Sequence, residues 1–142
     1  MTITKLSGAV VGLGLVVAAV TSQVAHAQQA QLSRIASRLS DRGYVATHEV
    51  TEGWLNDGES ATFTVWLRGS TRYTVRGTCD VDCSDLDLVL ERGGSFVDSD
   101  TLRDSIPIVN ASPATSGRYT VTVTMANCSN EPCAYTVGVF GR

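Results

Sequence analysis

The 142-residue chain is 43% hydrophobic and 18% charged, and its formal net charge is −3. A chain of this length has room for one domain with one core. Its fourteen acidic residues outnumber its eleven basic ones, which argues against the concentrated basic surface that nucleic-acid binding requires. We therefore expect no nucleic-acid partner.

The first twenty-seven residues have the pattern of a secretory signal peptide. Lys5 precedes an apolar run over 6–20, which is shorter than the ~20 residues of a membrane span. The small residues at 25–27 suit cleavage by signal peptidase. An uncleaved anchor is the alternative. We predict a secreted or periplasmic protein that begins at Gln28 and has no membrane segment after cleavage.

Residues 28–43 are predicted to form one amphipathic helix that ends near Gly43. Its apolar residues recur at the i, i+3, i+4, i+7 spacing of a single helical face. They are Leu32, Ile35, Ala36 and Leu39. We expect this face to pack on the domain that follows. A partner-binding helix is the alternative, whereas a membrane-surface helix would need bulkier apolar residues and more than three arginines.

The rest of the chain, 44–142, alternates apolar and polar residues with a period of two, which is typical of half-buried antiparallel strands. Turn-forming clusters separate the runs. The clear runs are 60–67, 71–78, 85–90, 118–125 and 134–140, and weaker ones are 44–50, 95–98 and 105–110. About eight short strands and one helix predict an all-β fold, a two-sheet antiparallel β-sandwich of the jelly-roll or Greek-key kind.

All four cysteines follow the predicted signal peptide, and an exported chain folds where disulfides persist. Near neighbours come within bridging distance wherever the chain turns, which favours Cys79 with Cys83 and Cys128 with Cys133. Pairing across the two sets is the alternative. A Cys79–Cys83 bridge requires a bend, because four extended residues would separate the α-carbons by about 13 Å. The spacings also differ from the C-x2-C motif of redox proteins.

Eight of the fourteen acidic residues lie between positions 80 and 104, which raises the possibility of a calcium site. The segment does not fit an EF-hand loop, because Asp85 stands where that loop needs glycine. A looser site is the metal hypothesis, and calcium is the one cofactor it implies. The alternative is a solvated acidic face whose aspartates bond turn amides. The expected ligands are Asp80, Asp82 and Asp85, with Asp100 or Asp104 from a neighbouring loop.

Catalytic groups are scarce in this sequence. His48 is the only histidine after the predicted signal peptide, and Ser95 lies in a GGSFV segment that lacks the last glycine of a nucleophile elbow. A small hydrolase that uses paired carboxylates is a weak alternative. We predict that the protein is not an enzyme.

Four stretches of the strand region share a family pattern. They are LNDGESATFTVWLRGSTRYTVRG, the DLDLVL run, the GGSFVDSD hairpin and PATSGRYTVTVTM. From Trp54 to Phe140 the chain resembles the bacterial pre-peptidase C-terminal domain family. The resemblance implies a non-catalytic β-sandwich that assists secretion, folding or attachment, and some related collagen-binding modules bind calcium. This chain departs from the pattern because it carries four cysteines and no peptidase.

Together these observations predict a disulfide-stapled module that binds or attaches to an extracellular protein or glycan. The predicted contact residues are Trp66, Arg72 and Arg76 on exposed strand faces. Such residues can also face solvent for solubility alone. An accessory or inhibitory partner of a secreted peptidase is the second hypothesis.

Overall fold

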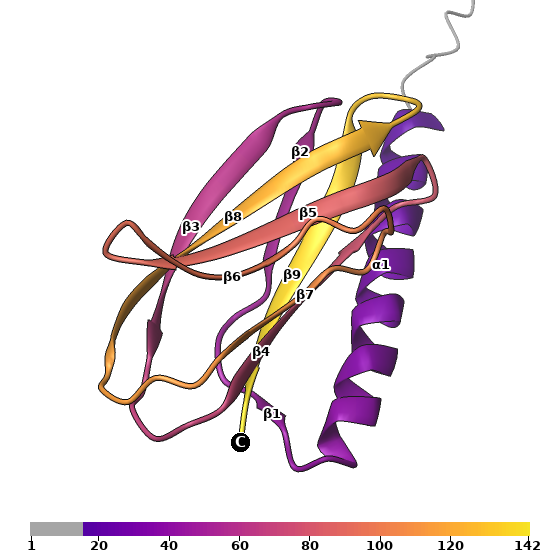
Figure 1. The fold of residues 1–142 in the computed structure, drawn as a ribbon. Helices are drawn as coiled ribbons and strands as arrows, with labels where there is room; N and C mark the ends of the chain where they lie inside the picture. The colour runs from indigo at the N-terminus through magenta and orange to yellow at the C-terminus, as the bar shows by residue number, and fades with distance from the viewer. Residues whose placement is uncertain (1–15) are drawn as a thin grey trace, which may run out of the picture.

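The computed structural model describes residues 16–142, with side chains from residue 26 onward. One helix, α1 (Val16–Ser40), precedes nine strands (Figure 1). The strands are β1 (Val45–Ala46), β2 (Thr51–Leu55), β3 (Ser60–Leu67), β4 (Tyr73–Cys79), β5 (Cys83–Arg92), β6 (Ser95–Asp100), β7 (Ile108–Ala111), β8 (Gly117–Cys128) and β9 (Cys133–Gly141). Among the described residues no helix combines the length and apolarity needed to cross a bilayer.

The strands form two antiparallel sheets, which confirms the predicted β-sandwich. The first sheet has the order β1-β9-β4-β7, and β2 also pairs with β9. The second sheet has the order β3-β8-β5-β6. The weak run at 44–50 yields only the two residues of β1, and β2 follows it as a separate strand. The other runs become strands with bounds shifted by a few residues.

The core lies between the two sheets because alternation sends one side chain in two toward the opposite sheet. In β5 the leucines at 86, 88 and 90 are fully buried, and in β8 the same holds for Val121, Val123 and Met125. The threonines between the apolar residues of β8 face outward and are partly exposed. The period-two pattern in the sequence is therefore the pattern of the core.

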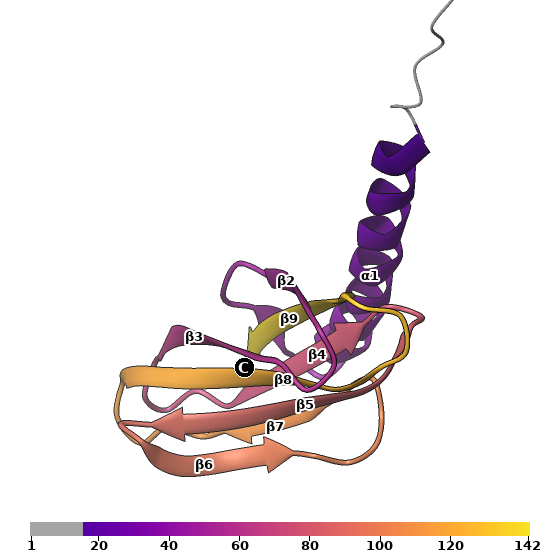
Figure 2. The ribbon, with the colours of Figure 1, turned by 90° about the horizontal axis from the view of Figure 1, so that it is seen from above.

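Helix α1 covers the outer face of the first sheet, across β9 and β4 (Figure 2). Leu32 and Leu39 of the helix form a second apolar cluster with Phe140 of β9. All nine residues of β9 are buried because the strand has the core on one face and the helix on the other. The predicted packing of the helix on the domain is thus confirmed.

In the full chain the helix runs from Val16 to Ser40, so it ends three residues before the predicted limit and includes the last part of the predicted signal peptide. Residues 16–27 contain neither glycine nor proline and continue the helix. The start at Gln28 rested on cleavage after residue 27, which stays a prediction. Gly43 lies in the turn after the helix with a φ of 81°. Of the predicted signal peptide, the first fifteen residues lie outside the described part of the chain.

Candidate functional site

Both predicted disulfides are present in the local pairing, Cys79 with Cys83 and Cys128 with Cys133. In each the α-carbons are 5.9 Å apart. The first closes the corner between β4 and β5, and the second closes the corner between β8 and β9. Because Cys83 is paired in register with Cys128, the two corners lie side by side at one end of the sandwich.

Asp80 connects these two corners through its carboxylate. Its Oδ2 accepts the N–H of Ala134 at 2.7 Å, and its Oδ1 accepts the N–H of Asp82 at 3.2 Å. Both oxygens that the calcium hypothesis assigned to a metal therefore bond backbone amides. This carboxylate fixes the end of β9 to the stapled corner.

Two further predicted calcium ligands also bond backbone amides. Asp100 accepts from Leu102 at 3.1 Å and from Ile108 at 2.8 Å, and Asp104 accepts from Ile106 at 2.8 Å. Within residues 26–142 no three His, Cys, Asp or Glu side chains are grouped so that they could hold a metal ion. The calcium site stays a prediction, and three of its five expected ligands serve the backbone.

The remaining carboxylates of interest lie on the outer face of β5. One oxygen of Asp85 and one of Asp87 are buried without a hydrogen-bond partner. Burial is the main cause that raises the pKa of Asp87. Neighbouring carboxylates raise it further, namely those of Asp85, Asp100 and Asp104. Sequence reasoning missed Asp87 as a perturbed group, because the run at 85–90 indicated only a half-buried strand with this aspartate on its polar face.

A recess of about 470 Å³ opens where the end of β3, the start of β4 and the chain around β1 meet. Trp66 lies at this recess with 58% of its surface exposed. The polar side chains beside it are those of Thr47, His48, Arg68, Thr71, Tyr73 and Arg142. No acidic side chain lines this recess, although the chain as a whole is acidic. We call it the Trp66 recess.

Hydrogen bonds hold the walls of the Trp66 recess in place. His48 Nε2 lies 3.1 Å from the carbonyl oxygen of Trp66, and His48 Nδ1 lies 2.9 Å from Thr47 Oγ1. On the other side, the hydroxyl of buried Tyr73 accepts the N–H of Arg68 at 3.0 Å. Both ring nitrogens of His48 make a hydrogen-bond contact, so this histidine joins Thr47 to the backbone of Trp66 in the wall of the recess.

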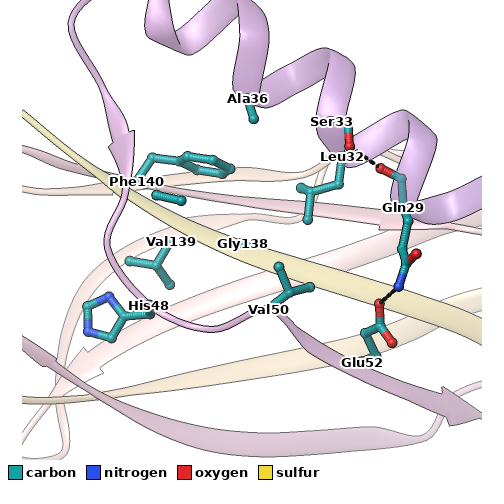
Figure 3. A pocket seen from close by; sticks show the side chains of 11 residues that line it. Gln29, Leu32, Ser33, Ala36, His48, Val50, Glu52, Gly138, Val139 and Phe140 are labelled. Carbon is teal, nitrogen blue, oxygen red and sulfur yellow. Dashed lines mark hydrogen bonds between the residues drawn. The ribbon is translucent and has the colours of Figure 1, made fainter.

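A second, apolar trough of about 310 Å³ lies between α1 and the segment around β1 and β2 (Figure 3). Leu32 and Ala36 of the helix form one wall, Val50 lies opposite, and β9 forms the floor. Gln29 Nε2 donates to Glu52 Oε1 at 3.4 Å across one end. His48 lines both hollows, so the trough and the Trp66 recess lie on either side of the same short segment.

The structure separates the three residues predicted as one contact surface. Trp66 lies on the outer side of the second sheet, whereas Arg76 lies on the outer side of the first, with its Nε buried and unpartnered. Burial, and then the charge of Arg42, lowers the pKa of Arg76. Arg72 is exposed and its N–H donates to the carbonyl of Arg142 at 3.0 Å. Only Trp66 belongs to the recess.

Sequence reasoning missed Arg68, Thr71 and His48 as neighbours of Trp66. Arg68 and Thr71 flank a turn that was read only as punctuation between strands, and the recess forms from segments that are distant in the sequence. No protein-family model matches this sequence, and no curated protein matches it significantly. The resemblance to pre-peptidase C-terminal domains therefore stays a prediction.

Proposed function

We propose that this protein is a secreted, non-catalytic module that attaches to extracellular polysaccharide by stacking a sugar ring on Trp66. The observation that carries the proposal is the exposed indole at a recess lined by hydroxyl, imidazole and guanidinium groups. A sugar ring has an apolar face of C–H groups and an edge of hydroxyls. It therefore matches an aromatic surface with polar groups around it.

The size and charge of the recess agree with such a ligand. Its volume of about 470 Å³ falls within the range of roughly 300–1,000 Å³ that is usual for ligand sites. Arg68 can donate several hydrogen bonds in one plane, which suits both hydroxyls and the carboxylates of acidic sugars. Arg68 and Arg142 both line the recess, and none of its described lining residues is an Asp or a Glu, so its side chains suit an acidic sugar.

The same lining supports attachment over hydrolysis. Glycoside hydrolysis uses two carboxylate side chains on either side of the scissile bond, and no Asp or Glu of the described residues lines the Trp66 recess. The two disulfides indicate an oxidising, extracytoplasmic environment, where a secreted module can meet extracellular polysaccharide. A disulfide-bonded sandwich with the exposed Trp66 at an open recess is suited to binding such a polymer.

Affinity electrophoresis through gels that contain a polysaccharide tests the proposal. Acidic gels of alginate or polygalacturonate and neutral gels of dextran or cellulose derivatives distinguish the two classes of sugar. We expect Trp66→Ala to weaken retention at least about tenfold, because buried aromatic anchors contribute more than about 1.4 kcal/mol. Trp54→Ala is the matched control, since Trp54 is also exposed, at 49%, and lies outside the recess.

Unchanged retention of Trp66→Ala in every gel, or loss of retention in both variants, would overturn the assignment of the site. No retention of the wild-type protein in any gel would reject polysaccharide as the ligand. In that case, recovery of a secreted peptidase by the wild-type protein would favour the alternative role as an accessory or inhibitory partner.

A further inference from the structure

Strand β3 is an edge strand with an unusual composition. Its eight residues, SATFTVWL, include no charged residue and no proline. All eight are in continuous register with β8, from Ser60 opposite Thr124 to Leu67 opposite Gly117. No strand of the described chain pairs with the other side of β3, which lies at the margin of its sheet (Figure 1). Such a long, regular and uncharged edge is a template for pairing with another strand.

The other edges of the sandwich are protected. Edge strand β7 has only four residues, and carboxylates of β6 accept its outward N–H groups, Asp100 from Ile108 and Asp98 from Asn110. Strand β6 carries those two aspartates, and its pairing with β5 shifts register after Leu90. On the remaining edge, β1 and β2 are short and separate. Among the edge strands of the described chain, only β3 is long, uncharged and regular, with no carboxylate on its outward N–H groups.

The backbone groups that point away from β8 can be identified from one hydrogen bond. The carbonyl oxygen of Trp66 is 3.1 Å from His48 Nε2, so the backbone of Trp66 faces the free side. In an antiparallel strand the N–H and C=O of one residue point to the same side, and the side alternates along the chain. The backbone groups of Thr62 and Thr64 therefore also face the free side, and His48 occupies only the Trp66 end.

We propose that β3 pairs antiparallel with β3 of a second copy of this chain, with Thr62 opposite Thr64 and Phe63 at the two-fold axis. This register uses the free backbone groups of both threonines and leaves the Trp66 carbonyl to His48. The charges that flank the strand support self-pairing, since Glu59 precedes β3 and Arg68 follows it. In this register Glu59 of one copy lies opposite Leu67 of the other, one position from Arg68, so opposite charges come near each other at both ends of the pair.

This pairing would join two four-stranded sheets into one. The two Trp66 side chains would lie on the same outer face, about 20 Å apart, because six residues separate them along the paired strands. If the proposed polysaccharide function holds, the dimer presents two recesses to one polymer and gains avidity. The pairing itself rests only on the edge of β3, so failure of either proposal leaves the other standing.

Light scattering after size exclusion, at concentrations from about 10 µM to 1 mM, tests the pairing. We expect the wild-type mass to rise toward twice the monomer mass. The double variant T62K/T64K sets lysines opposite each other across the two-fold axis and should remain monomeric. The matched control is T120K/T122K, because Thr120 and Thr122 are the partners of these threonines on central strand β8 and share their face.

A second variant guards against a control that fails to fold. Thr64→Pro removes an N–H that points away from β8, so the fold tolerates it and the dimer does not form. Under mild oxidation, T62C and T64C proteins mixed together should cross-link, and neither should cross-link alone. A wild-type protein that stays monomeric, a T62K/T64K variant that still dimerises, or cross-linking of T64C with itself would overturn the proposal.

Discussion

The carboxylate of Asp100 on β6 accepts the N–H of Ile108 on β7 at 2.8 Å, and so joins edge strands of two different sheets. Asp98 repeats the contact two residues away, where it accepts the N–H of Asn110 at 2.7 Å. Carboxylates that accept backbone N–H groups make stronger hydrogen bonds than neutral acceptors. Through Asp98 and Asp100, the edge strand β6 of one sheet is thus joined to the edge strand β7 of the other along one side of the sandwich.

Asp100→Ala should lower the free energy of unfolding by about 1–3 kcal/mol, because it leaves the N–H groups of Leu102 and Ile108 without their acceptor. Urea titration followed by circular dichroism measures the change. Asp41→Ala is the control, since Asp41 is exposed after the helix, and its effect should stay within about 0.5 kcal/mol. Equal effects of the two substitutions would show that the bridge between β6 and β7 adds no stability.

Gln28 is the polar contact that secures α1 to the first sheet. It is 5% exposed, its Nε2 donates to the carbonyl of Ala134 at 3.0 Å, and its Oε1 accepts from Thr136 Oγ1 at 3.3 Å. Gln28→Ala should cost about 1–3 kcal/mol of unfolding free energy, because two buried polar groups lose their partner. Gln29→Ala, one position along the same helix and exposed, should cost less than about 0.5 kcal/mol. Thermal unfolding of both variants decides the matter, and similar melting temperatures would contradict the role of Gln28.

The strand pattern and the stapled corners could be predicted from the sequence because both depend on local spacing. The leucines of β5 alternate wherever the strand is placed, and Cys79 and Cys83 can bridge whenever the chain bends between them. The Trp66 recess could not be predicted, because Thr47 and His48 come from a segment 18 or more residues before Trp66 and reach it only in the folded chain. The burial of Thr136 on β9 could not be predicted either, because this side chain is buried only where helix α1 covers the strand.

The fate of the acidic residues shows a second limit of sequence reasoning. The same carboxylate oxygens can bind a calcium ion or accept hydrogen bonds from backbone N–H groups. A cluster of aspartates in the sequence therefore fits both uses. Asp80 bonds an amide 54 residues away in the sequence, and nothing near it in the chain marks that partner. Only the arrangement of the corners distinguishes the two uses.

The two disulfides should each stabilise the fold by a modest and similar amount. Their sequence separations are 4 and 5 residues, and on the chain-entropy model loops this short contribute about 2 kcal/mol each. The variant C79S/C83S should therefore fold, with a midpoint of urea unfolding lower than that of the wild type. The variant C128S/C133S is the internal comparison and should lose a similar amount. A C79S/C83S variant that fails to fold would indicate that the corner does more than shorten a loop.

Asp87→Asn should raise the melting temperature at pH 7, because it removes a negative charge that burial and neighbouring carboxylates disfavour. The rise should be only about 2 °C, since solvent screens much of that unfavourable charge interaction. The pKa of Asp87 is raised in the folded protein, first by burial and then by neighbouring carboxylates, so its ionised form is disfavoured there. Its contribution to stability falls as the pH rises through that raised pKa. The gain should vanish near pH 3, below the ordinary carboxyl pKa of 3.8, where both states are protonated. The wild-type protein also tests the metal hypothesis, because a calcium ion bound by Asp80, Asp82 and Asp85 should raise the melting temperature at millimolar calcium. No shift with calcium or EDTA would exclude that site.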